Sequence, residues 1–331
     1  MKRTVGLAIL AFALGTAASA QNAPPPNMPP FPQQTPEEKA KSDADQAAYA
    51  KMPDTEGTGA YPAMKEEDPS LPDHVVYRPK DLSKVGQGAL GIVGWGNGAC
   101  SKDGAGSRLY LAEIASYGYV VVAPGGIHSG PGSVPLPPPP PGPPKFVMAT
   151  SAGDVKAGID WALAENARPG SAYYGKIDPT KLAVAGFSCG GAQAIELASD
   201  PRVKTVIMQN SGMFPDNMNF IPDLKVSKAT LKTLHTPIIY ILGGTKDIAY
   251  NNGMDDFSRI DTVPVVAVSN HSDHGGDFLR PNGGPSAKVA VEWLEWQLRG
   301  DKKAEAYFVG ENCGVCTDKE WTVERKNLPA Q

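Results

Sequence analysis

The stretch from Lys181 to Gly191, which reads KLAVAGFSCGG, restricts the possible fold of this chain more than any other feature. Its apolar part, Leu182 to Ala185, predicts a buried strand, and a helical run from Ala192 to Ser199 follows closely. Between them lies Gly186-Phe-Ser-Cys-Gly190, the only G-x-S-x-G in the chain. A turn this tight between a strand and a helix needs small residues around its central serine. We therefore expect Ser188 on a sharp turn, with its hydroxyl projecting above the sheet.

Short apolar segments alternate with helical patterns on both sides of this stretch. Four to six apolar residues in succession indicate strands that are buried on both faces, as in a parallel sheet covered by helices. The pair Ser151 and Asp154 has the spacing of a helix-capping box. The predicted strands lie at 74–78, 89–94, 119–124, 182–185, 203–208, 237–242 and 263–268, and the predicted helices at 107–117, from 151 onward, 192–199 and 285–298.

The composition is that of a globular protein of ordinary charge. Of the 331 residues, 41% are hydrophobic and 20% are charged, which is enough apolar material for a sizeable core. The net charge is −4 and no basic block is present, so we expect no nucleic-acid partner. We expect residues 73–331 to form a single domain, and the sequence makes no prediction about its oligomeric state.

The first 72 residues differ from the remainder of the chain. Residues 1–20 have the pattern of a secretory signal peptide: Lys2 and Arg3, an apolar run from Val5 to Leu14, and Ala18-Ser-Ala20. Export to the periplasm or the extracellular space is therefore expected, with no stable membrane anchor, because the apolar run is too short to span a bilayer. Residues 21–72 are rich in proline and polar residues and predict a largely disordered linker, with a solvated helix over 35–50.

A serine hydroxyl needs a base to remove its proton and a further group to orient that base. Two loops that follow predicted strands carry such groups. Asp247 follows the strand that ends at Leu242, and His271 and His274 follow the strand that ends at Val268. The order serine, acid, histidine is thus available as Ser188, Asp247 and His274. His274 precedes two glycines and is our first choice for the base, with His271 as the second choice.

Attack on a carbonyl creates an oxyanion, which preorganised N–H groups must stabilise. The backbone N–H of Cys189, directly after the serine, is one expected donor. The backbone of Gly96, in the loop after an earlier predicted strand, is the other. The neighbouring Trp95 is expected either to form an apolar wall for a substrate or to be a buried structural residue.

The chain contains four cysteines, and export would place them in an oxidising compartment. Cys100 and Cys189 adjoin the two expected oxyanion donors, so they are expected to form a disulfide or to remain two buried thiols. Cys313-Gly-Val-Cys316 has the spacing of a redox motif or of half a zinc knuckle. No second pair or nearby histidine completes a metal site, so a local Cys313–Cys316 disulfide is the preferred interpretation.

Four motifs together resemble those of a known superfamily: Gly94-Trp-Gly-Asn-Gly98, Gly186 to Gly191, Gly243-Gly-Thr-Lys-Asp247 and His274-Gly-Gly276. From about Val75 onward the chain resembles secreted α/β-hydrolases of the esterase/lipase and dienelactone-hydrolase-like superfamily, and is broadly similar to polyester-hydrolase-like enzymes.

This resemblance implies an α/β-hydrolase fold, a mostly parallel twisted sheet with helices on both faces. It also implies Ser188 as nucleophile, Asp247 as acid and His274 as base. The expected substrate is a small-molecule or polymeric ester, cleaved without a cofactor or a metal ion. The chain departs from the superfamily in its Pro/Gly-rich insertion at 125–144 and in Cys189 after the serine, and both departures concern the shape of the pocket.

Parts of the same motifs also match those of other protein classes. Gly94-x-Gly96-x-x-Ala99 matches a permissive dinucleotide fingerprint, but a polar loop follows it where a helix is required. The sequence from Ser269 to His274 is similar to a metal-ligand cluster, but too few other histidines remain to complete it. An α/β-hydrolase-type peptidase, or a catalytically inactive binding protein on the same scaffold, remains the alternative to an esterase.

Overall fold

The computed structural model describes residues 35–137, 147–216, 224–275 and 277–329. All of them belong to one compact unit that spans residues 34–331. The predicted signal peptide and residues 21–34 of the predicted linker lie outside the described residues.

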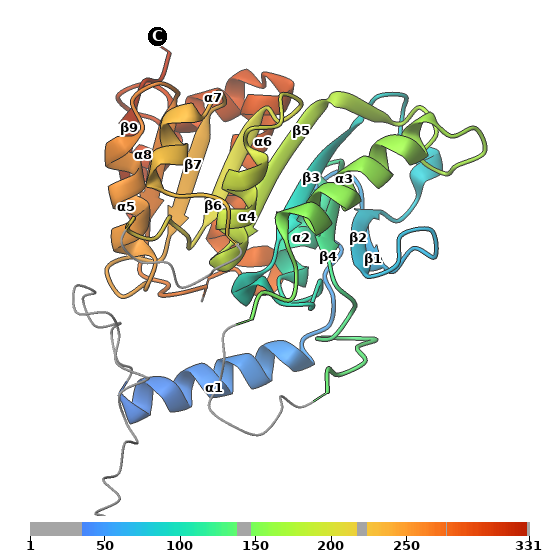
Figure 1. The fold of residues 1–331 in the computed structure, drawn as a ribbon, viewed down its shortest axis with the longest axis horizontal. Helices are drawn as coiled ribbons and strands as arrows, with labels where there is room; N and C mark the ends of the chain where they lie inside the picture. Colours follow the sequence, from blue (N-terminus) through green and yellow to red (C-terminus); the bar gives the residue numbers. More distant parts are fainter. Residues whose placement is uncertain (1–34, 138–146, 217–223, 276, 330–331) are drawn as a thin grey trace, which may run out of the picture. The chain divides into compact units, whose positions relative to one another are not determined.

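Within the described residues, one sheet of nine strands forms the centre of the fold. Its order is β1-β2-β4-β3-β5-β6-β7-β8-β9, which Figure 1 shows from blue on the right to red on the left. Neighbouring strands from β4 to β8 are parallel, whereas the pairs β1–β2, β2–β4 and β8–β9 are antiparallel. The strands are β1 (Ala63–Glu66), β2 (His74–Pro79), β3 (Leu90–Gly96), β4 (Tyr119–Pro124), β5 (Ile177–Phe187), β6 (Thr205–Gln209), β7 (Ile238–Leu242), β8 (Val265–Ser269) and β9 (Thr322–Lys326).

Helices cover both faces of this sheet because successive strand residues point to opposite sides. Ile92 of β3, for example, packs in one apolar core with side chains of α3, α4 and α5. Val93, the next residue, packs in a second core with side chains of α2, α6 and α7. The helices are α1 (Pro36–Lys51), α2 (Arg108–Ser116), α3 (Ala152–Ala167), α4 (Cys189–Leu197), α5 (Tyr250–Arg259), α6 (Gly284–Arg299), α7 (Lys302–Phe308) and α8 (Gly314–Thr317).

The structure confirms the predicted fold class. It is an α/β fold with a mostly parallel sheet between two layers of helices, consistent with an α/β-hydrolase-like fold. Each predicted strand overlaps an observed one, and the predicted capping box is present, because Ser151 and Asp154 exchange hydrogen bonds at the start of α3. In the part of the chain that the structure describes, no helix has the length and apolar character needed to cross a membrane.

The folded domain begins before residue 73, the predicted boundary between linker and domain. The sheet already begins with β1 at Ala63–Glu66, which pairs with β2, and the expected solvated helix is present as α1. The prediction of a largely disordered linker is therefore corrected for residues 35–72. A short strand such as β1, with the sequence AMKE, has no apolar pattern of its own, and it is held by its neighbour at the edge of the sheet.

Arg108, the first residue of α2, fastens the end of α1 to the remainder of the unit. Its side chain is only 1% exposed, and its Nη2 donates to the carbonyl oxygens of Tyr49 (2.6 Å) and Met52 (2.8 Å). Its Nε pairs with Asp54 at 3.0 Å, and its guanidinium lies 4.1 Å from the centre of the Tyr49 ring. One buried cation thus holds the end of α1 and the residues that directly follow it.

We predict that Arg108→Ala releases α1 while the sheet stays folded. The substitution removes hydrogen bonds made by a buried charge, so the free energy of unfolding should fall by about 2–3 kcal/mol. Trypsin should then cut in α1, after Lys39, Lys41 or Lys51, well before it cuts in the sheet. Lys156→Ala is the control, because Lys156 pairs with Asp160 at the surface, where their side chains are 46% and 43% exposed, and this change should cost under about 1 kcal/mol. Equal stability and equal cleavage in the two variants would contradict the assignment.

Candidate active site

The turn between β5 and α4 holds Ser188 in a backbone conformation that is uncommon for a residue with a side chain. Its φ is 51° and its ψ is −118°, and its N–H donates to the carbonyl of Gln209 at 3.1 Å. Strain of this kind persists where the surrounding structure enforces it. Here the enforcing contact is steric, because a Cβ on Gly186 would overlap the carbonyl of Gly190.

A second loop, which follows β3, lies directly against this turn. A Cβ on Gly190 would overlap the carbonyl of Gly96, so the two backbones touch. The disulfide Cys100–Cys189 joins the same two loops, with a Cα–Cα distance of 5.3 Å. The alternative of two buried thiols is therefore wrong. Ala99 and Cys100 both have positive φ angles, of 53° and 46°, so the joined loop is as tightly constrained as the serine turn.

Ser188, His274 and Asp247 form a continuous line of hydrogen bonds. His274 Nε2 lies 3.1 Å from Ser188 Oγ, and His274 Nδ1 lies 2.6 Å from Asp247 Oδ1. An ionised carboxylate can only accept a hydrogen bond, so Nδ1 carries the imidazole proton and donates it to Asp247. Nε2 of the neutral ring is then free to accept the hydroxyl proton of Ser188.

Asp247 is fixed by more than its histidine. Its side chain is fully buried, and its Oδ2 accepts from the N–H of Gly243 (3.0 Å) and from Nδ2 of Asn210 (2.8 Å). Its Oδ1 also accepts from the N–H of Ala249 at 2.9 Å. A buried carboxylate that receives this many donors keeps a single orientation.

Two of the residues that hold this line were not identified in the sequence. Asn210, directly after β6, donates to Asp247 and also to the carbonyl of Asp273 at 3.0 Å, and so it joins the loops of Asp247 and His274. Ser211 donates from its hydroxyl to the carbonyl of Ser188 at 2.7 Å. The polar run Gln209-Asn-Ser211 directly after an apolar strand was the available signal for them.

The two candidate histidines have different surroundings. His274 is partly buried, and its ring lies 5.0 Å from that of Phe187, which also packs on Phe278 at 4.6 Å. Gly275 has a φ of 83°, and a Cβ there would press on the Phe187 ring. His271 is exposed. The structure thus places His274, our first choice, beside Ser188 and Asp247.

The residues expected at the oxyanion site also lie together. Gly96 pairs with Gly186 in the sheet, and Cys189 is the first residue of α4. Trp95 is 0% exposed and packs against Tyr110 at 5.4 Å in the core. It is therefore a buried structural residue, and it does not form a wall that a substrate could contact.

The remaining cysteine pair is also joined. Cys313 and Cys316 form a disulfide, as predicted, beside the short helix α8. Among the described residues, no group of three or more His, Cys, Asp or Glu side chains is placed to hold a metal ion.

This arrangement is suited to activating a hydroxyl. Ser188 presents a proton to a neutral imidazole, and the buried carboxylate of Asp247 can stabilise that imidazole when it becomes charged.

Comparison with protein-family models finds no match, and comparison with curated proteins also finds none.

We predict that Gly190→Ala destabilises the protein by about 2 kcal/mol or more, because the new methyl group would meet backbone that cannot move aside. The free energy of unfolding can be measured by urea denaturation. Gly86→Ala is the matched control: no atom lies within 4 Å of a Cβ there, and we expect a change within about 0.5 kcal/mol. A tolerated Gly190→Ala would show that the two loops do not touch.

We also predict unequal contributions from the two disulfides. Cys100–Cys189 spans 89 residues of sequence and Cys313–Cys316 spans 3, so the first constrains the unfolded chain far more. Replacing both cysteines of the first pair by serine should cost about 3–4 kcal/mol, and the same change in the second pair should cost less. Thermal unfolding of the two double variants checks this, and equal losses would be against it.

Proposed function

We propose that the protein is a serine hydrolase that cleaves carboxylic esters through an acyl-enzyme. The observation that carries this proposal is the alignment of Ser188, His274 and Asp247, with hydrogen bonds of 3.1 and 2.6 Å. The hydroxyl, the imidazole and the carboxylate each have the partner that their role in such a triad requires. The resemblance of the motifs to those of secreted α/β-hydrolases supports the same activity.

In the first step, Ser188 Oγ attacks the ester carbonyl while His274 Nε2 takes the hydroxyl proton. Asp247 accepts a hydrogen bond from Nδ1 and so stabilises the imidazolium that forms. The tetrahedral intermediate then collapses, the bond to the alcohol breaks, and the leaving oxygen receives the proton from Nε2. The products of this step are the free alcohol and an acyl group bound to Ser188.

In the second step, water takes the place of the alcohol. His274 removes a proton from the water as it attacks the acyl carbon, and it returns that proton to Ser188 Oγ when the acid leaves. The enzyme is thus restored without any group other than these three and the oxyanion donors.

The negative oxygen of both intermediates needs N–H donors. Cys189 is the first residue of α4, so its N–H has no partner within the helix, and the N-terminus of a helix favours negative charge. The second donor comes from Gly96, the last residue of β3, whose backbone touches Gly190. The Cys100–Cys189 disulfide holds these two donors at a constant separation.

We further propose that the protein acts outside the cytoplasm, in the periplasm or the extracellular space. Two disulfides are typical of proteins that fold in an oxidising compartment. The signal-peptide pattern of residues 1–20 points in the same direction.

The test is hydrolysis of a 4-nitrophenyl ester and labelling by a fluorophosphonate. Ser188→Ala should abolish labelling and lower kcat by at least about a thousandfold, because no other group can form the acyl-enzyme. Circular dichroism should remain that of the native protein. Native protein that neither hydrolyses esters nor reacts with the probe would support the inactive binding protein, and cleavage of peptides in preference to esters would support the peptidase.

Variants of the two histidines identify the base. His274→Ala should lower kcat about as much as Ser188→Ala, since both remove a member of one unit. The matched control is His271→Ala, three residues away on the same loop, and we expect its kcat to remain within about twofold of the native value. A larger loss at His271 would reverse the assignment.

A further inference from the structure

A small apolar cluster lies beside Ser188, and one of its members, Leu224, also packs against the first large core. We call it the cystine patch and define it by five residues: Cys100, Cys189, Met148, Phe214 and Leu224. The two cysteines are buried and form its floor, while the other three side chains are partly exposed and pack against them.

The cystine patch lies on both sides of Ser188: Cys100 and Met148 are across Ser188 from the base, whereas Phe214 and Leu224 follow β6, on the side of the base. In the order β4-β3-β5-β6-β7-β8, Ser188 follows β5, whereas Asp247 and His274 follow β7 and β8. Cys100 follows β3, and Met148 lies in the connection after β4. Because the carboxyl ends of parallel strands meet at one edge of a sheet, the imidazole reaches Ser188 from one side and this part of the patch flanks the other.

The cystine patch contains no charged side chain, and two of its members adjoin the proposed oxyanion donors. An acyl group whose oxygen rests on those donors would therefore have apolar atoms as its neighbours. Methylene groups gain free energy on such a surface, whereas a charged acyl group would lose its hydration without compensation. We propose that the cystine patch binds the acyl group, and that the substrates are esters of uncharged, apolar acids. This inference rests on the proposed esterase activity.

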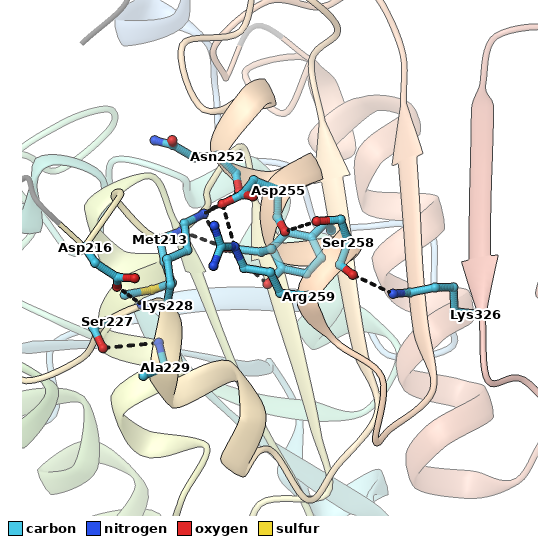
Figure 2. A network of polar contacts seen from close by, with 12 residues as sticks. Met213, Asp216, Ser227, Lys228, Ala229, Asn252, Asp255, Ser258, Arg259 and Lys326 are labelled. Carbon is cyan, nitrogen blue, oxygen red and sulfur yellow. Dashed lines mark hydrogen bonds and ion pairs between the residues drawn. The ribbon is translucent and has the colours of Figure 1, made fainter. Parts of the chain in front are cut away.

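The chain on both sides of Phe214 is fixed in place, so this part of the patch is formed before a substrate arrives. The N–H of Met213 donates to Asp256 Oδ2 at 2.7 Å, and Asp216 Oδ1 accepts from the N–H of Lys228 at 3.2 Å. Figure 2 shows Met213 and Asp216 beside Lys228. A surface that is already ordered loses little conformational entropy on binding.

The network in Figure 2 is itself anchored by a buried ion pair. Lys228 Nζ lies 2.6 Å from Asp256 and 2.8 Å from Asp255, and its side chain is 1% exposed. Burial raises the pKa of Asp256 to about 6, against the opposing effect of Lys228. Breaking such a pair leaves a buried charge without a partner, which makes the anchor a stable one.

The test compares 4-nitrophenyl acetate, butyrate, octanoate and hemisuccinate, which share one leaving group. Each kcat/KM is divided by the rate of hydroxide cleavage of the same ester, to remove differences in intrinsic reactivity. We expect the native enzyme to favour butyrate over acetate by about tenfold, from two buried methylene groups, and to disfavour the anionic hemisuccinate.

Phe214→Ala should lower the kcat/KM for butyrate more than that for acetate, and so remove most of the preference for butyrate. Phe214→Lys should raise the ratio of hemisuccinate to butyrate by at least about tenfold, because the new cation attracts the anionic acyl group and excludes the apolar one. Loss of folding alone would not produce this gain. Tyr174→Ala is the matched control: Tyr174 is an aromatic residue, 51% exposed, in the connection that leads into the opposite end of β5.

The outcomes separate the two proposals. Hydrolysis that depends on Ser188 but is insensitive to the acyl group, or a Phe214→Ala variant that loses acetate and butyrate activity equally, would overturn the acyl-binding role of the cystine patch and leave the esterase proposal standing. Absence of Ser188-dependent hydrolysis of all four esters would overturn the esterase proposal itself.

Discussion

Backbone contact between Gly96 and Gly190 is the constraint on which the candidate site depends. Neither residue has room for a Cβ, so the loop after β3 and the turn after β5 meet without intervening side chains. That approach brings the N-terminus of α4 beside Gly96 at the end of β3, while the contact between Gly186 and Gly190 holds Ser188 at its positive φ. The Cys100–Cys189 disulfide then makes the contact permanent. The position of Ser188 and the placement of the proposed oxyanion donors thus both depend on close contacts that leave no room for a Cβ at Gly190, Gly96 or Gly186.

The other half of the site depends on hydrogen bonds. Asn210 connects three strand ends: it follows β6, and its amide donates both to Asp247 after β7 and to the carbonyl of Asp273 after β8. Because Asp247 is buried and fully paired, the ring of His274 is held at its Nδ1 while its Nε2 stays beside Ser188. Phe187 packs on the His274 ring and on Phe278, so apolar contacts limit the movement of the imidazole that the hydrogen bonds still allow. A rigid scaffold of this kind suits a reaction in which charge develops at fixed positions.

The segment that carries Phe214 combines a polar anchor with an apolar surface. The segment that carries Phe214 is fastened by Met213 and Lys228 to the buried Asp256, away from the reacting atoms. The surface that it presents beside the disulfide has no charge. A strong electrostatic anchor and an uncharged binding surface therefore coexist on one short length of chain. In this way the acyl-binding surface that we propose can be apolar while the backbone beneath it is held in one position.

Local patterns were sufficient for much of the fold. The apolar strands, the capping box at Ser151 and the G-x-S-x-G turn depend on neighbouring residues, and the structure contains each of them. The edge strands β1 and β9 were missed because short polar strands are stabilised by pairing partners distant in sequence, a contact that no local pattern records.

For the candidate site, the sequence by itself determined the serine turn, an acid and a pair of histidines at successive strand ends, in the order that the hydrolase interpretation requires. Only the tertiary structure decided that His274, and not His271, lies beside Ser188, that Cys100 pairs with Cys189, and that Asn210 holds the acid. The physical reason is the path of the loops. Residues 86 positions apart meet at a distance of 3.1 Å, and which side chain arrives there depends on packing and backbone turns throughout the sheet edge.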